Sequence, residues 1–259
     1  MIVCYNEFLA DTRYHAVCGG MGESIENVWD MAQPLSYLVA SSDTINGLAW
    51  NSDAPVEYIS DYDNNGYEDY YAPEQNQATE NEKQPTNLSA IVENTPELEN
   101  RFRAFIDNPP ESYCKEASRF RWHADFSTVN FQKMLEASLP ILCGAQLADI
   151  GNLTDITVTK RTGSGRVAEL SIATDKGNFT VSGDKIRWLT SGGKIGPSGL
   201  KSTLFYIEKA DNGIVFKGGG WGHGVGLCQE GAQGRARAGQ SYVDIIKHYY
   251  PGCELKAAN

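Results

Sequence analysis

The chain has 259 residues, of which 41% are hydrophobic, and its formal net charge is -11. This length and composition predict a globular protein with a sizeable buried core. The negative charge argues against a general nucleic-acid binder and against attraction to anionic membranes. It does not argue against a glycan ligand, which proteins hold through hydrogen bonds and aromatic stacking.

The N-terminal residues predict a pair of strands. Asn6 and Glu7 interrupt the apolar stretch near the start, so we expect no secretory signal there, and no apolar run is long enough to cross a bilayer. An extended run over 13–17 follows. Ser24 is a candidate N-cap for a short helix that reaches Trp29.

The composition changes over residues 51–94, which are rich in Asp, Glu, Asn, Gln, Tyr and Pro and poor in aliphatic side chains. Such a segment buries little apolar surface, so it predicts a long surface insertion. A tyrosine-bearing lip over a glycan groove is the functional alternative. The insertion separates residues 1–50 from residues 95–259, which we expect to be two parts of one domain.

The C-terminal part predicts an α+β fold with a β-rich half. Thr95 is expected to cap a helix that has Pro96 in its first position and ends before the Asn108-Pro-Pro stop. Further helices are predicted over 128–139, 229–238 and 242–249. From Ile150 onward, short alternating runs separated by Gly, Asp and Asn predict several strands.

Residues 218–232 are the most informative segment, because seven glycines fall within them. Glycine in regular structure costs roughly 1 kcal/mol relative to alanine, so such a loop exists where something approaches its backbone closely. The loop presents Trp221, His223 and Gln229. It lacks the GxxxxGK[ST] pattern of a phosphate loop. A tight turn that packs Trp221 inward, with His223 bonded to backbone carbonyls, is the structural alternative.

The run from Trp221 to Gly252, WGHGVGLCQEGAQGRARAGQSYVDIIKHYYPG, resembles the C-terminal signature of the stage II sporulation protein D family, also called amidase enhancers. The segment Tyr14–Gly20, YHAVCGG, with Glu23 and Trp29 downstream, resembles a second family segment. Shorter similarities follow in the expected order at Tyr37–Val39, Arg121–Trp122, Ser164–Val167 and Ser202–Phe205. The similarity covers most of residues 10–253, apart from the acidic insertion.

This resemblance implies a peptidoglycan-acting protein related to lytic transglycosylases that cleave peptide-free glycan strands. It implies a mixed, two-lobed body, an extracytoplasmic location, no cofactor, and a cell-wall amidase as a potential partner, while the negative charge argues against a nucleic-acid partner. A non-catalytic peptidoglycan-binding protein or amidase activator is the alternative. The residues expected to bind the glycan are Tyr14, His15, Ser202, Trp221, His223 and Gln229.

Lytic cleavage needs a carboxylic acid that protonates the glycosidic oxygen and then accepts the proton of the attacking hydroxyl. In the family this glutamate lies in a Glu-Ala-rich helix upstream of the Y-H segment, and this sequence contains no such helix. Glu23 and Glu230 are the candidate replacements. In the alternative interpretation, Glu23 caps or pairs within its turn and Glu230 begins a helix, where the dipole favours a negative charge.

Six cysteines occur without a CxxC pair, at positions Cys4, Cys18, Cys114, Cys143, Cys228 and Cys253. Free buried thiols and one or two disulfides are both compatible with this pattern. His15 and Cys18 have the spacing of two zinc ligands, with Cys4 or Cys114 as partners, but four ligands at motif spacing are absent. The sequence therefore predicts no metal site. Cys228 follows the glycine loop at a helix start, which lowers a thiol pKa, but no matching base identifies it as a nucleophile.

Overall fold

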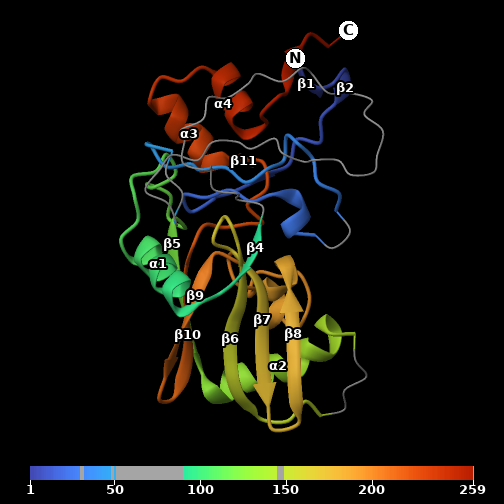
Figure 1. The fold of residues 1–259 in the computed structure, drawn as a ribbon, viewed down its shortest axis with the longest axis vertical. Helices are drawn as coiled ribbons and strands as arrows, with labels where there is room; N and C mark the ends of the chain where they lie inside the picture. Colours follow the sequence, from blue (N-terminus) through green and yellow to red (C-terminus); the bar gives the residue numbers. More distant parts are fainter. Residues whose placement is uncertain (30–31, 48–49, 51–89, 145–148, 259) are drawn as a thin grey trace, which may run out of the picture.

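The computed structural model describes residues 1–29, 32–47, 50, 90–144 and 149–258. Figure 1 shows two halves. A β-rich half, residues 90–107, 121–144 and 149–219, occupies the lower part of the view, and the loop 108–120 reaches into the upper part. A terminal half, residues 1–47 and 220–258, occupies the upper part and holds both ends of the chain. The residues predicted as an acidic insertion, 51–94, lie mostly outside the described part of the chain.

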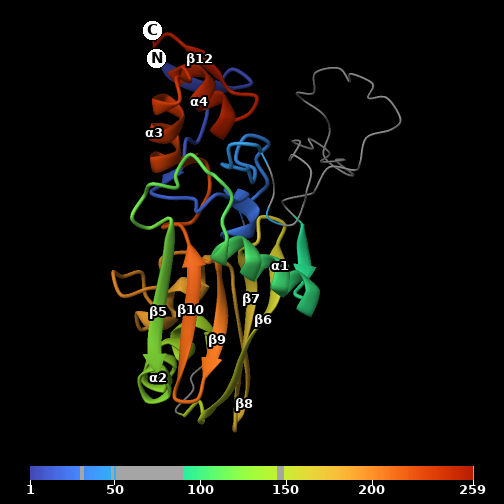
Figure 2. The ribbon, with the colours of Figure 1, turned by 90° about the vertical axis from the view of Figure 1, so that its left-hand side faces the viewer.

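The β-rich half is built on antiparallel sheets. One has the strand order β4-β6-β7-β8 and the other β5-β10-β9, and Figure 2 shows them side by side. The strands are β4 (Ile91–Glu93), β5 (Arg121–Ser127), β6 (Leu153–Thr162), β7 (Val167–Thr174), β8 (Gly177–Ser182), β9 (Phe205–Ala210) and β10 (Gly213–Gly219). Burial alternates along β7, as expected for a strand with one face in the core.

Helix α2 (Thr128–Leu142) completes the core of this half together with the 3-10 helix η2 (Gly183–Thr190). Phe131, Leu135 and Leu139 share one buried cluster with side chains of both sheets. Ser127 caps α2, since its side chain accepts the backbone N–H of Asn130.

Helix α1 (Pro96–Asp107) forms as the sequence predicts. The Thr95 side chain accepts the backbone N–H of Leu98, Pro96 is the first helical residue, and Phe102, Phe105 and Ile106 are buried.

In the terminal half the two chain ends share one sheet, with the order β12-β1-β2. A parallel pair, β3 and β11, lies deeper. The elements are β1 (Ile2–Tyr5), β2 (Phe8–Leu9), β3 (Tyr14–His15), η1 (Ile25–Asn27), β11 (Leu227–Cys228), α3 (Gln229–Arg237), α4 (Tyr242–Tyr249) and β12 (Glu254–Lys256). A separate hydrophobic cluster, in which Leu38, Val225 and Tyr249 are buried, holds these short elements together.

The α+β prediction is confirmed, with a β-rich segment after Ile150 and the expected C-terminal helices. Two boundaries differ. Helix α2 continues to Leu142 beyond the predicted residue 139. Ser24 precedes only a short 3-10 helix, and its side chain makes no cap hydrogen bond. The domain boundaries stay a prediction. None of the helices in the described part of the chain is long and apolar enough to cross a membrane.

Candidate functional site

The glycine-rich loop lies directly against the N-terminal Y-H segment. Val17 and Trp221 exchange backbone hydrogen bonds, with N···O distances of 3.1 and 2.7 Å. The Leu227 N–H donates to the Arg13 carbonyl at 3.0 Å, and β11 continues this pairing alongside β3. The two segments that carry the family resemblance, at opposite ends of the chain, therefore form one local structure.

Close backbone packing explains the glycines of the loop. A Cβ at Gly226 would lie 2.1 Å from the Arg13 carbonyl oxygen, and one at Gly220 would lie 2.6 Å from the Val17 carbonyl oxygen. Both residues also have positive φ, +69° and +77°, which L-residues avoid. The partner that approaches the loop backbone is thus the Y-H segment of the same chain.

The side chains at the rim of this structure are exposed. Tyr14 is 61% exposed and Trp221 is 47% exposed, so Trp221 does not pack inward as the structural alternative required. Gln229, the first residue of α3, is also exposed. We call Tyr14, Trp221 and Gln229, with the half-buried His223, the loop surface.

His223 is held in one tautomer. Its Nδ1 accepts the Val225 N–H at 3.0 Å, so the neutral ring carries its proton on Nε2. Burial, together with the positive potential of neighbouring His15, lowers the pKa of His223 to about 4. The Trp29 ring packs 5.0 Å from the His223 ring, centroid to centroid. At neutral pH His223 is therefore an uncharged hydrogen-bonding group with a fixed orientation.

His15 lies beneath the loop and is only 4% exposed. Its Nδ1 is 3.1 Å from the Val225 carbonyl oxygen, to which it must donate, and its Nε2 has no hydrogen-bond partner among the described residues. Burial, with a smaller contribution from Arg166, lowers the pKa of His15 to about 3. The neutral His15 ring thus supports the loop from inside.

Ser202, another predicted glycan contact, is completely buried. Its hydroxyl donates to the Gly219 carbonyl at 2.7 Å and accepts the Leu204 N–H at 3.2 Å. These bonds fix the end of β10, where the chain enters the glycine-rich loop. The structure therefore brings Ser202 next to the base of the loop but away from its exposed rim.

Of the two candidate carboxylates, Glu23 is the buried one, with 1% exposure. Its Oε2 accepts the hydroxyls of Thr162 at 2.6 Å and Ser164 at 2.7 Å. Its Oε1 accepts the Ser24 N–H at 2.8 Å and the Asn27 amide at 3.0 Å. Burial raises the pKa of Glu23, and these hydrogen bonds oppose that shift. Both oxygens are engaged, so a glycan reaches Glu23 only if the surrounding loop opens.

Glu230 lies in the first turn of α3 and is half-buried. Its backbone N–H donates to the Ala16 carbonyl at 3.2 Å, which ties the helix start to the Y-H segment. In sequence it directly follows Gln229 of the loop surface. Glu230 is therefore the candidate carboxylate that solvent reaches.

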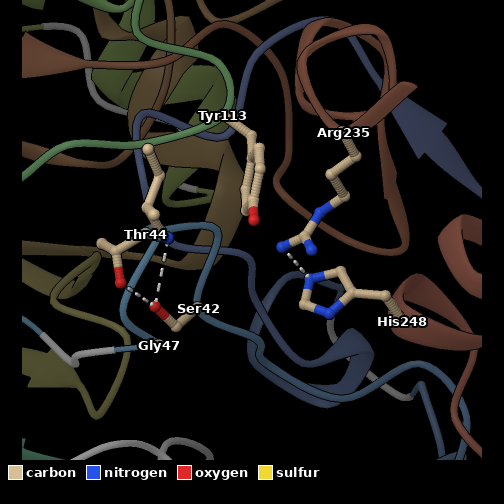
Figure 3. A pocket seen from close by; sticks show the side chains of 7 residues that line it. Ser42, Thr44, Gly47, Tyr113, Arg235 and His248 are labelled. Atoms are coloured by element: carbon tan, nitrogen blue, oxygen red, sulfur yellow. Dashed lines mark hydrogen bonds between the residues drawn. The ribbon is translucent and has the colours of Figure 1, made fainter. Parts of the chain in front are cut away.

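A cavity that the sequence did not indicate lies between residues 42–47, Tyr113 and the helices α3 and α4. It has a volume of about 260 Å³ and is lined by Ser42, Thr44, Ile45, Gly47, Tyr113, Arg235 and His248. Figure 3 shows the Arg235 guanidinium beside His248, with Nη2 and Nε2 2.7 Å apart. Burial lowers the pKa of His248 to about 3, as does Arg235. Hydroxyl, guanidinium and neutral imidazole groups make this a polar cavity.

The thiols considered as metal ligands are only partly brought together. Cys18 and Cys114 are adjacent, with their Sγ atoms 3.4 Å apart. His15 is not part of this group of ligands, and its Nδ1 donates to the Val225 carbonyl. Cys228 joins the two thiols, because its Sγ accepts the Cys18 N–H at 3.2 Å. All six cysteines are free in the structure.

Comparisons with known proteins support the resemblance. The family model described as Domain of unknown function (DUF8618) matches residues 23–226. An uncharacterized protein of Brachyspira hyodysenteriae is 46% identical over 61 residues, 24% of this chain and 17% of that protein. The amidase enhancer of Bacillus subtilis is 46% identical over 61 residues, 24% of this chain and 9% of that protein. Stage II sporulation protein D of Bacillus amyloliquefaciens is 29% identical over 155 residues, 60% of this chain and 39% of that protein. The matches thus span well under half of each of these curated relatives.

Proposed function

Because the chain belongs to the family described as Domain of unknown function (DUF8618) and resembles stage II sporulation protein D and the amidase enhancer, we propose that it is an extracytoplasmic cell-wall protein that binds peptidoglycan glycan strands. The observation that carries this proposal is the loop surface, where the two family-like segments meet and expose aromatic side chains.

Sugar recognition requires flat apolar faces next to fixed hydrogen-bonding groups. Trp221 and Tyr14 supply the aromatic faces, at 47% and 61% exposure. Gln229 supplies an amide with two donors and an acceptor, and His223 supplies a neutral ring with its proton on Nε2. None of these groups is charged at neutral pH, which suits an uncharged sugar ring better than a phosphate or a nucleic acid.

Lytic cleavage of the bound strand is the second candidate function. It is favoured by Glu230, which lies one residue beyond Gln229 and is half-buried. Glu23 is less suited to the reaction, because its two oxygens already accept four hydrogen bonds. An action alongside a cell-wall amidase fits either candidate, since an amidase produces the peptide-free strands.

The test is incubation of the protein with peptide-free strands, with sedimentation to measure binding and mass spectrometry to detect anhydromuramic ends. Retention without cleavage supports a binding protein. Cleavage that Glu230→Gln abolishes while retention persists supports the lytic reaction. If the folded protein neither retains nor cleaves the strands, the proposal is contradicted. Intact, peptide-bearing strands serve as the matched ligand control.

A further inference from the structure

Below the glycine-rich loop, four potential metal ligands converge from four separate segments. The Sγ atoms of Cys18, Cys114 and Cys228 and a carboxylate oxygen of Asp43 all lie within 4.8 Å of one another. Each of these residues is at most 1% exposed. Cys18 lies shortly after β3, and Asp43 lies in the segment 32–47. Cys114 lies in the loop between α1 and β5, and Cys228 is the N-cap of α3.

The spacing is close to that of a tetrahedral zinc site. A Zn–S bond of about 2.3 Å places two sulfur ligands about 3.8 Å apart at tetrahedral angles. Cys18 Sγ is 3.4 Å from Cys114 Sγ and 3.4 Å from Asp43 Oδ2. Side-chain shifts on the order of 1 Å therefore convert the present arrangement into a complete ligand set.

Hydrogen bonds from neighbouring side chains hold the Asp43 carboxylate in a fixed orientation, as they do for carboxylates that bind metals. Its Oδ1 accepts Arg235 Nη2 at 2.9 Å, Arg235 Nε at 3.1 Å and the Tyr249 hydroxyl at 2.9 Å. Its Oδ2 instead faces the thiol of Cys18. One oxygen is held by the protein and the other is directed at the sulfurs, which is how hydrogen bonds fix ligating carboxylates.

Backbone donors are also directed at the sulfurs. The Cys228 Sγ accepts the N–H groups of Cys18 and Gly231, both at 3.2 Å, and the Cys18 Sγ accepts the Gly20 N–H at 3.4 Å. Such bonds stabilise thiolates more than thiols.

Cations surround the cluster. Arg235 pairs with Asp43, and Arg166 donates to the Cys18 carbonyl at 3.3 Å. Arg166 is 1% exposed, and its Nε and Nη1 have no hydrogen-bond partner among the described residues. A buried guanidinium with two unbonded nitrogens is expensive unless negative charge lies close by. Three thiolates, one carboxylate and one Zn²⁺ sum to a charge of about -2. Arg235 and Arg166 offset this charge in part, since Glu23 also lies close to Arg166.

We propose that Cys18, Asp43, Cys114 and Cys228 bind a zinc ion that fastens the Y-H segment to the glycine-rich signature. The site is closed, with four protein ligands and no exposed position, so its role is structural. It crosslinks residues that lie 210 positions apart in the chain. The terminal half consists mostly of short elements, and such a crosslink stabilises it where regular secondary structure contributes little. This inference does not depend on glycan binding.

Metal loading replaces protons. Each S–H bond breaks as a Zn–S bond forms, and the released protons go to solvent. Because all four ligands are deprotonated when they bind the metal, zinc affinity falls as the pH is lowered.

The first test is the metal content of the purified full chain after expression in zinc-containing medium. We expect about one zinc per chain. Cobalt(II) reconstitution should add the near-ultraviolet thiolate-to-cobalt absorption and the strong visible bands of a tetrahedral site. These measurements use the parent protein, so they remain decisive if a variant fails to fold.

The second test compares Cys114→Ala with Cys253→Ala, which replaces an equally enclosed cysteine outside the cluster, 4% exposed against 1%. The Cys114→Ala variant should contain at least tenfold less zinc per chain than the parent, and the Cys253→Ala variant should contain as much as the parent. Parent protein without zinc and without the cobalt–thiolate band would overturn the proposal. So would equal zinc retention in both variants, or a Cys18–Cys114 disulfide found by mass spectrometry in the freshly isolated protein.

Discussion

Replacing Glu23 distinguishes an anchoring carboxylate from a catalytic one. Four donors converge on its two oxygens, at 2.6 to 3.0 Å, and it is 1% exposed. Its ionised form also faces Arg166, which opposes the pKa rise caused by burial. In Glu23→Ala these donors lose their acceptor and Arg166 loses a nearby negative charge.

The expected cost follows from those contacts. Removing one partner of a buried charged network costs about 3–5 kcal/mol. Single hydrogen bonds to a charged group contribute about 1.5–3 kcal/mol each, and because they are not additive the total cost is less than the sum of four. Glu23→Gln keeps the shape and one acceptor oxygen, and the hydroxyls of Thr162 and Ser164 can rotate to accept from its amide. We therefore expect a smaller loss, about 1–3 kcal/mol, for Glu23→Gln.

Urea unfolding followed by tryptophan fluorescence measures these losses. The predicted order of stability is parent, then Glu23→Gln, then Glu23→Ala, with an unchanged dependence on urea concentration. Ser164→Ala removes the partner hydroxyl of the same contact and serves as the control. The double variant Ser164→Ala with Glu23→Gln should lose less unfolding free energy than the sum of the two single variants. A Glu23→Ala variant within about 1 kcal/mol of the parent would refute the anchoring role.

Three further predictions follow from the terminal half and the base of the loop. Gly234→Ala should destabilise the protein, because the added Cβ would lie 1.9 Å from the Tyr113 carbonyl oxygen. This clash should outweigh the helix preference of alanine over glycine, which is about 1 kcal/mol. A raised melting temperature would contradict this prediction. Ser202→Ala should cost about 1–2 kcal/mol of stability and leave glycan affinity unchanged, whereas weaker glycan binding at unchanged stability would show that Ser202 contacts the sugar. The folded pKa of His15, about 3, lies below its ordinary 6.5, so its contribution is complete above pH 6.5 and is lost as the pH falls toward 3. Between pH 7 and pH 5 the parent should thus lose about 2 kcal/mol relative to His15→Phe, and an unchanged difference would contradict the buried neutral ring.

The features that sequence analysis predicted are local ones. The Thr95 cap, the Pro96 start and the apolar face of α1 lie within a dozen residues, so propensity and periodicity suffice to predict them. The glycine-rich loop was likewise identified by its composition. Its partner was not, because only the fold shows that the Arg13 carbonyl fills the space where a Cβ of Gly226 would lie.

The remaining features depend on contacts between distant segments. Glu23 meets Thr162 across 139 positions, and no spacing rule connects them. The thiol cluster brings together Cys18 and Cys228, which lie 210 positions apart, and its fourth member is Asp43 rather than a cysteine. A search for paired cysteine motifs therefore misses this cluster. Ser202 belongs to a family-like segment, yet the fold places its hydroxyl inside, where it fixes the entry to the loop. Similarity to a motif thus predicted where a candidate site lies, but it did not distinguish exposed side chains from those that support the loop from inside.

Glycan binding at the loop surface is tested most directly by the affinity of peptide-free strands for the parent, Trp221→Ala and Tyr242→Ala. Trp221 and Tyr242 are 47% and 60% exposed, but Tyr242 lies on α4, outside the loop surface. Loss of a central aromatic contact costs about 1–3 kcal/mol, which is roughly a 5- to 150-fold weaker affinity. We expect that loss for Trp221→Ala and parent-like binding for Tyr242→Ala. Equal affinities for all three proteins would show that the glycan does not bind at the loop surface.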